Sequence, residues 1–202
     1  MCSIFQLLPG FNIPDNLLFN AVHNNEHGYG ILFRENKKIK VDKAMPEKVD
    51  PEALGKILKE HDDVERWVHL RNRSEGDVSI NNVQPIQIFE SKKRSLYFVH
   101  NGTIYSGLTV PDDQKKFLTE ELSDKIDSDS RKFAVGKLMP LFSRFQGQHG
   151  FGDLTDPFLR ELLAKMWTSA HGRAAIISSD QDPVLFNPSG WEKIKTPDGE
   201  FL

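Results

Sequence analysis

The pattern of hydrophobic and polar positions predicts mostly strands in the first half of the chain. An apolar run from Ser3 to Leu8 ends at Pro9-Gly10, as expected of a buried strand. A polar turn at residues 35–37 and a charged turn at residues 90–94 each separate two further runs, which is typical of hairpins. The strands predicted after the first are Ile31–Phe33, Ile39–Val41, Trp67–Leu70, Pro85–Phe89 and Leu96–His100.

Helical spacing dominates the second half. The predicted helices run from Pro14-Asp15 through Val22, from Asp50-Pro51-Glu52 through Leu58, and over Gln114–Ile126, Arg131–Phe145 and Asp156–Ala170. A closing hairpin is predicted over Ala174–Ser178 and Val184–Phe186. Early strands, central helices and late strands favour an α+β fold with antiparallel sheets, in one domain spanning residues 1–202. The apolar faces between Arg131 and Ala170 favour a core role over a docking surface.

Composition excludes several classes of function. The chain has 202 residues, of which 38% are hydrophobic and 27% are charged. Its net charge is -3, and it has no long run of Lys or Arg that would favour binding to nucleic acid. No apolar run reaches the roughly 18 residues that span a bilayer, and no basic region precedes the first apolar run. We therefore expect a cytoplasmic protein with no membrane partner. Its single cysteine excludes an internal disulfide and a multi-thiolate zinc site.

The position of that cysteine suggests chemistry. Methionine removal in the cytosol favours a small second residue, so we expect Cys2 to become the mature N-terminus. Its thiol, with an ordinary pKa of about 8.5, and its α-amine, at about 7.7 to 8.0, then supply a nucleophile and a base on one residue. The alternative is that Cys2 is a small buried hydrophobic residue.

Three other segments fit attack by a thiolate on an amide. Asn101-Gly102, at the exit of a predicted strand, offers two donors for an oxyanion, and Arg71 and Asp129 suit the carboxylate and ammonium of an amino acid. Each has an ordinary structural alternative. Asn-Gly is common in tight turns, Arg71 has Glu65 and Glu75 as surface ion-pair partners, and Asp129 is a suitable helix cap.

Six short segments, spread over residues 2 to about 130, are informative when they are taken together in their order along the chain. They are Met1-Cys2, Gly28-Tyr29-Gly30-Ile31, His69-Leu70-Arg71 with Gly76 following, Asn82-Val83-Gln84-Pro85-Ile86, His100-Asn101-Gly102-Thr103-Ile104 and Ser128-Asp129-Ser130. In this order they resemble the motifs of the class II glutamine amidotransferases, the cysteine branch of the N-terminal nucleophile hydrolases. A weaker similarity continues at Gly172-Arg173-Ala174-Ala175.

The resemblance implies a four-layer αββα sandwich with two facing antiparallel sheets and a glutaminase activity without metal or organic cofactor. L-Glutamine would be hydrolysed through a γ-glutamyl thioester, and the ammonia would pass to a separate synthetase, since the chain is too short to include one. The implied roles are nucleophile and base for Cys2, oxyanion hole for Asn101 and Gly102, carboxylate binding for Arg71, ammonium binding for Asp129, and a substrate contact for Ser74 in place of a family threonine.

Departures from the family pattern leave the substrate open. His27 replaces an acidic residue, Gln84 and Ile86 replace His and Phe, and Arg131 replaces an acidic residue. Two alternatives therefore remain, namely a hydrolase of another γ-glutamyl amide and a non-catalytic binding module of the same fold. The segment from His23 to His27 also matches the H-x-x-E-H pattern of a zinc peptidase, but its Asn residues and the following glycine are typical of a helix end, so we expect no metal site there.

Overall fold

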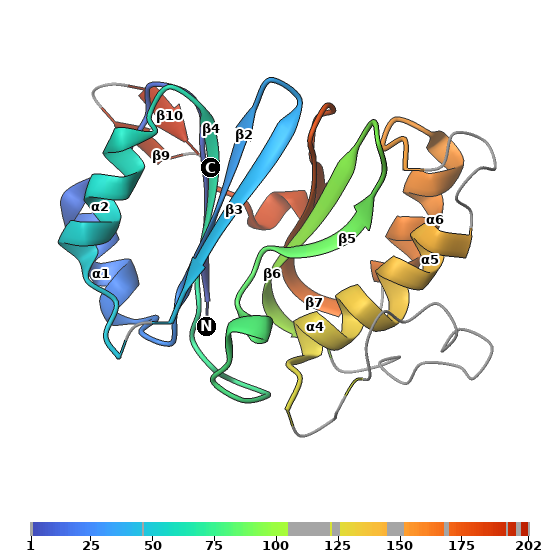
Figure 1. The fold of residues 1–202 in the computed structure, drawn as a ribbon, viewed down its shortest axis with the longest axis horizontal. Helices are drawn as coiled ribbons and strands as arrows, with labels where there is room; N and C mark the ends of the chain where they lie inside the picture. Colours follow the sequence, from blue (N-terminus) through green and yellow to red (C-terminus); the bar gives the residue numbers. More distant parts are fainter. Residues whose placement is uncertain are drawn as a thin grey trace.

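Two four-stranded antiparallel sheets face each other in the computed structural model, which describes residues 2–45, 47–104, 122, 126–144, 152–167, 170–192, 194–196 and 199–201 (Figure 1). The first sheet has the strand order β1-β4-β2-β3. Its strands are β1 (Ser3–Leu7), β4 (Glu65–Leu70), β2 (Tyr29–Glu35) and β3 (Lys38–Ala44). The second sheet has the order β5-β6-β7-β8, with β5 (Ile86–Glu90), β6 (Ser95–Ile104), β7 (Ala170–Ser178) and β8 (Val184–Phe186).

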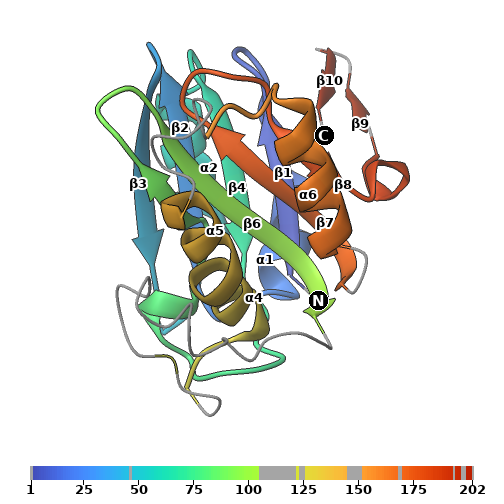
Figure 2. The same cartoon turned by 90° about the vertical axis from the view of Figure 1, so that its right-hand side faces the viewer.

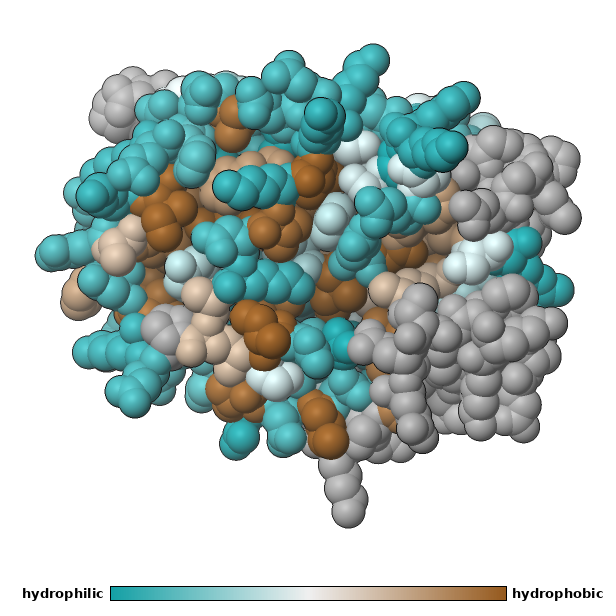
Figure 3. All heavy atoms as spheres, in the orientation of Figure 1, coloured by the Kyte–Doolittle hydropathy of each residue, from teal (hydrophilic) through white to brown (hydrophobic). Residues whose placement is uncertain are grey.

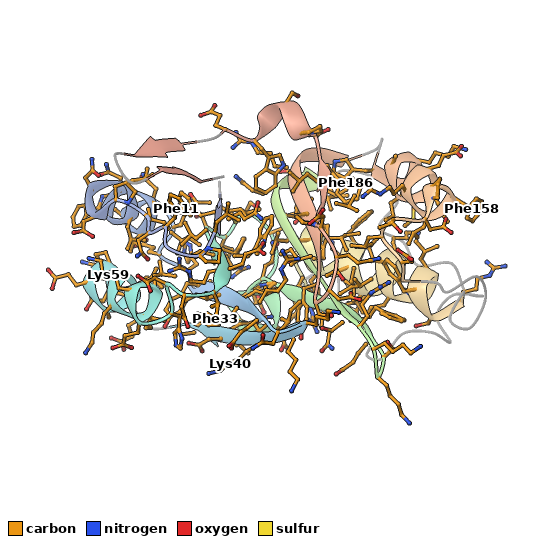
Figure 4. All side chains as sticks on the ribbon, turned by 90° about the horizontal axis from the view of Figure 1, so that it is seen from above. Phe11, Phe33, Lys40, Lys59, Phe158 and Phe186 are labelled. Atoms are coloured by element: carbon orange, nitrogen blue, oxygen red, sulfur yellow. The ribbon has the colours of Figure 1, made fainter. Side chains whose placement is uncertain are left out.

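Helices cover the outer face of each sheet. The first sheet carries α1 (Asp15–His23) and α2 (Pro51–Glu60), and the second carries α4 (Asp129–Phe133), the π-helical turn Ala134–Leu138, α5 (Met139–Arg144) and α6 (Pro157–Trp167). Figure 2 shows α4, α5 and α6 over β6 and β7. In Figure 4, Lys59 on α2 and Phe158 on α6 mark the two outer layers on opposite sides of the molecule. The order of layers is therefore αββα.

The alternation of side chains along each strand separates the layers. In β4, Val68 and Leu70 pack under the helices of the first sheet, whereas Trp67 points to the second sheet. Between the sheets, the fully buried side chains form a small cluster of Leu32, Trp67, Val99, Ala175 and Ile177. Each sheet is therefore covered on both faces, which explains why all six residues of β4 are buried.

Most of the predicted elements are confirmed, and their boundaries show what the pattern missed. β6 continues to Ile104, so the interpretation of Asn101-Gly102 as a tight turn is wrong: Gly102 pairs with Gly172 inside the sheet. The predicted helix 156–170 ends at Trp167, because β7 begins at Ala170. The predicted helix 114–126 lies almost wholly outside the described residues. The hairpin of β9 (Ile194–Thr196) and β10 (Gly199–Phe201) was not predicted.

Hydrophilic residues predominate along the outline of the face shown in Figure 3, with hydrophobic residues interspersed among them. Across the described part of the chain, no helix combines the length and the apolar character that crossing a membrane requires.

Candidate active site

A polar pocket lies at the end of the sandwich where β1 begins and where β4 and β6 end. Five of the six predicted site residues line it, namely Cys2, Arg71, Ser74, Gly102 and Asp129. The other lining residues are Asn72, Glu75, Asn82, Gln84, His100, Ser128 and Ser130. Segments more than a hundred residues apart in the sequence therefore meet here.

Cys2 precedes β1, and the β1/β4 register, with Ser3 opposite Leu70, brings it beside Arg71. Its Sγ atom lies 3.4 Å from both the carbonyl oxygen and the amide nitrogen of Asn72. Burial raises the pKa of the Cys2 thiol, while the Asn72 hydrogen bond and the charge of Arg71 act in the opposite direction. A thiol with a raised pKa needs a nearby base to become a nucleophile at neutral pH.

Arg71 follows β4 and is almost completely buried, with 3% of its surface exposed. Its Nη2 atom donates to the carbonyl oxygens of Asp77, at 3.0 Å, and Glu75, at 3.4 Å, while Nη1 has no hydrogen-bond partner in the described part of the chain. Glu65 instead pairs with Arg34 on β2. The surface ion-pair alternative for Arg71 is therefore wrong. A buried guanidinium with a free donor is suited to bind a carboxylate.

Asp129 is the first residue of α4, while Ser128 is its N-cap and accepts a hydrogen bond from the amide of Arg131. The Asp129 carboxylate is 3% exposed. Its Oδ2 atom accepts from the amide of Ile104 at 2.7 Å, and its Oδ1 atom accepts from the amide of Ser130 at 2.7 Å. Asp129 thus joins the end of β6 to the start of α4 and brings a negative charge to the pocket.

The other two predicted residues lie next to each other in β6. Gly102 lines the pocket, whereas Asn101 does not. Asn101 lies two residues after Val99, which packs between the sheets. Because side chains alternate along a strand, the Asn101 side chain is directed toward the first sheet, which contains β1 and is preceded by Cys2. Its buried Oδ1 atom lacks a hydrogen-bond partner among the described residues.

Gly76 brings the loop after Arg71 against α4. It has a φ angle of +70°, and a Cβ atom there would lie 2.6 Å from the amide nitrogen of Ser128. The Asp77 amide continues this contact by donating to the Ile126 carbonyl at 2.8 Å. Only glycine fits this close approach without moving the backbone, which explains its position in the motif.

Several residues of the pocket were not among the predicted site residues. The His100 Nδ1 atom is hydrogen-bonded to Ser130 Oγ at 2.9 Å. Gln84 bonds to both main-chain groups of His100. Both residues belong to motif segments, because Gln84 precedes Pro85 and His100 precedes Asn101-Gly102. Their place in these segments is the signal that could have identified them.

His69 lies behind the pocket, on the inner face of β4, and is completely buried. Burial lowers the pKa of its imidazole to about 3, and the positive charges of Arg71 and Lys43 act in the same direction. Neither ring nitrogen has a hydrogen-bond partner within the part of the chain that the structure describes. His69 is thus neutral near pH 7.

The segment from His23 to His27, which matches a zinc-peptidase pattern in sequence, does not continue as a helix. α1 ends at His23, Asn24 is its C-cap, and the Nδ1 atom of His27 accepts the amide of Arg73. In the described ranges, no three His, Cys, Asp or Glu side chains are grouped to hold a metal ion.

Comparison with known proteins identifies the fold. The sequence matches no family model, and no curated protein matches it. A glutamine phosphoribosylpyrophosphate amidotransferase from B. subtilis superimposes with a TM-score of 0.51 and 17% identity, over 88% of this chain and 35% of that one. The structure described as the allosteric regulatory enzyme of purine biosynthesis gives a TM-score of 0.50 and 15% identity, over 89% of this chain and 36% of the other.

The chain thus spans about a third of the length of these two structures. Their likeness shows that it shares the fold of these two proteins, an α+β fold with two facing antiparallel sheets.

Proposed function

We propose that this chain is a glutaminase domain, which hydrolyses the side-chain amide of L-glutamine with Cys2 as the nucleophile. The observation that carries the proposal is the meeting of Cys2, Arg71 and Asp129 in one pocket, where the Arg71 Nη1 donor has no partner among the described residues. A thiol, a buried cation and a buried anion in one small pocket match the reacting group, the α-carboxylate and the α-ammonium of a free amino acid.

The first step needs a base, because burial raises the pKa of the Cys2 thiol. Removal of Met1 would free the α-amine of Cys2, which accepts the thiol proton as Sγ attacks the amide carbon of glutamine. The resulting oxyanion is held by the Gly102 amide and the Asn101 side chain. The ammonium of Cys2 then returns its proton to the leaving nitrogen, so ammonia departs and a γ-glutamyl thioester remains.

Water completes the cycle. The α-amine, now neutral, takes a proton from a water molecule that attacks the thioester carbon, and the second tetrahedral intermediate collapses to glutamate and the Cys2 thiol. Arg71 and Asp129 hold the amino-acid head through both halves, and Ser74 contacts it at the rim of the pocket. No metal or organic cofactor takes part in these steps.

The ammonia requires an acceptor. Because the chain covers about a third of its structural neighbours, we propose that a separate synthetase, or a further domain, uses the ammonia.

Intact-mass analysis with and without 6-diazo-5-oxo-norleucine tests the proposal, because this glutamine analogue alkylates an activated thiol. We expect loss of Met1, one adduct on Cys2, protection by excess glutamine, and no adduct on Cys2→Ala. Absence of the adduct on a protein that begins at Cys2 would contradict a glutamine site, and turnover of a bulkier γ-glutamyl amide would then identify the alternative hydrolase. Retention of Met1 on the cellular protein would favour the non-catalytic binding module.

A further inference from the structure

We propose that Gln84 is a positioning residue, which holds β6 so that the Gly102 amide faces the thiol of Cys2. The inference rests on the proposed function and adds to it a residue outside the nucleophile, the oxyanion donors and the groups that bind the amino-acid head. It follows from the way in which β6 is paired along its two sides.

On the side of β5, Gln84 takes the place of a strand residue. β5 pairs Ile86 with Phe98 and Gln87 with Tyr97, so the same register extended backward sets position 84 opposite His100. β5 itself begins only at Ile86, after Pro85, which has no amide proton to donate. The Gln84 carboxamide makes the missing pair instead, because its Oε1 accepts from the His100 amide and its Nε2 donates to the His100 carbonyl at 3.1 Å.

Gly102 lies between two such side-chain contacts. Alternate residues of an antiparallel strand direct their amide groups to the same side, so His100, Gly102 and Ile104 share the side that faces away from β7. The His100 amide is bound by Gln84, and the Ile104 amide is bound by Asp129 at 2.7 Å. Gly102, which lies between them, lines the pocket together with Cys2. The two contacts therefore hold the strand on either side of the Gly102 amide, for which the described residues provide no partner.

Gln84 is itself held firmly. Its side chain is 3% exposed, and its main chain lies against β2, where a Cβ atom on Gly30 would come within 1.9 Å of the Gln84 carbonyl oxygen. The first sheet thus fixes Gln84, and Gln84 fixes a strand of the second sheet. Without this contact, the His100 amide and carbonyl lose their pairing, and β6 is free to shift the Gly102 donor from the oxyanion position.

Two variants and one matched control test the inference. Gln84→Met keeps the length of the side chain and removes both hydrogen bonds, whereas Gln84→Glu keeps the acceptor and removes the donor when ionised. Gln87→Met is the control, because among the described residues the Gln87 carboxamide bonds only to the exposed Glu90 side chain, at 2.8 Å. Glutaminase kcat and KM are measured for each protein, together with hydrogen exchange of the peptide that covers β6.

We expect Gln84→Met to lower kcat by about tenfold to a hundredfold, with little change in KM. This fall in kcat is at most comparable to the one that follows the removal of an oxyanion donor. The kcat of Gln84→Glu relative to the unaltered protein rises as the pH falls from about 8 to 5, because a protonated carboxyl restores both hydrogen bonds and burial raises its pKa. Hydrogen exchange in β6 quickens in Gln84→Met and in ionised Gln84→Glu, and Gln87→Met matches the unaltered protein in every measurement.

A kcat of Gln84→Met equal to that of Gln87→Met would overturn the inference, as would a loss that falls on KM alone. If Gln84→Met does not fold, the pH-dependent recovery of Gln84→Glu decides, and its absence counts against the inference. If the unaltered protein has no glutaminase activity, the proposed function fails separately. Hydrogen exchange then still tests the role of Gln84, and equal exchange in all four proteins would overturn it.

Discussion

At the scale of single residues, Arg71 contributes to the pocket a buried donor that has no partner among the described residues. Arg71 Nη1 and Asn101 Oδ1 are two of the buried side-chain atoms that have no hydrogen-bond partner in the described structure. Such an atom costs about 1–3 kcal/mol, which folding alone does not recover. Under the proposed function, binding of the substrate carboxylate would offset this cost for Arg71. The structure gives no comparable reason for the unpaired Trp167 Nε1.

Arg71→Lys tests the carboxylate role. Lysine keeps the positive charge but loses the planar pair of donors, so we expect KM for glutamine to rise by about tenfold to a hundredfold, as loss of a charged hydrogen bond does, with a smaller change in kcat. Arg73→Lys is the control, because Arg73 is exposed and does not line the pocket. Steady-state kinetics of both variants check the prediction, and equal KM values would contradict it.

His69 makes stability depend on pH. The pKa of His69 is about 3 in the folded protein and near 6.5 in the unfolded chain, so between these values only the unfolded chain binds the proton. The free energy of unfolding should therefore fall as the pH falls below 6.5, by up to about 1.4 kcal/mol per pH unit from this residue. Urea unfolding from pH 7 to pH 4 measures this slope. His69→Leu should flatten it, and the exposed control His23→Leu should not.

Turns and loops bring the site together at the scale of elements, and Gly76 is the clearest case. Gly76→Ala meets two penalties, a φ angle of +70° and a Cβ atom 2.6 Å from the Ser128 amide. Gly10→Ala meets only the first, since Gly10 has a φ angle of +85° and open space around its Cβ position.

We expect Gly10→Ala to lower the free energy of unfolding by about 1–2 kcal/mol, the cost of a left-handed conformation, and Gly76→Ala to lower it further. Gly76→Ala should also raise KM, because the loop that it displaces holds Arg71 through the Glu75 and Asp77 carbonyls. Chemical denaturation and glutaminase kinetics compare the two variants. Equal stabilities with an unchanged KM would show that the loop does not need its contact with α4.

The same scale shows how far the sequence predicts the structure. Short apolar runs bounded by turn residues predicted β1 to β6, because a strand that is buried on both faces is apolar along most of its length. It failed at Asn101-Gly102, where a strong local turn signal gave way to pairing with Gly172 on a distant strand. The motif order predicted that Cys2, Arg71 and Asp129 belong to one site. The role of Gln84 was beyond prediction, because it depends on the register between β5 and β6.

At the scale of the whole molecule, the pocket joins groups that belong to different sheets. Cys2 and Arg71 adjoin β1 and β4 of the first sheet, whereas Gly102 belongs to the second and Asp129 to the helix layer above it. The distances between the pocket groups of the first sheet and those of the second therefore depend on the spacing of the sheets. The cluster around Trp67 and Ala175 maintains this spacing. Packing between the sheets should therefore influence catalysis without any contact with the substrate.

Ala174 and Ala175 allow this idea to be tested on one strand. Both are completely buried in β7, but Ala175 faces the first sheet and Ala174 faces the helices. Valine at either position adds volume to a packed core and should lower the free energy of unfolding by about 1–3 kcal/mol. Only Ala175→Val forces the sheets apart, so only this variant should slow alkylation of Cys2 by the glutamine analogue at a temperature where both proteins are folded. Equal alkylation rates in the two variants would mean that the site tolerates a change in sheet spacing, and that the loops hold Cys2 and Gly102 together without help from the sandwich.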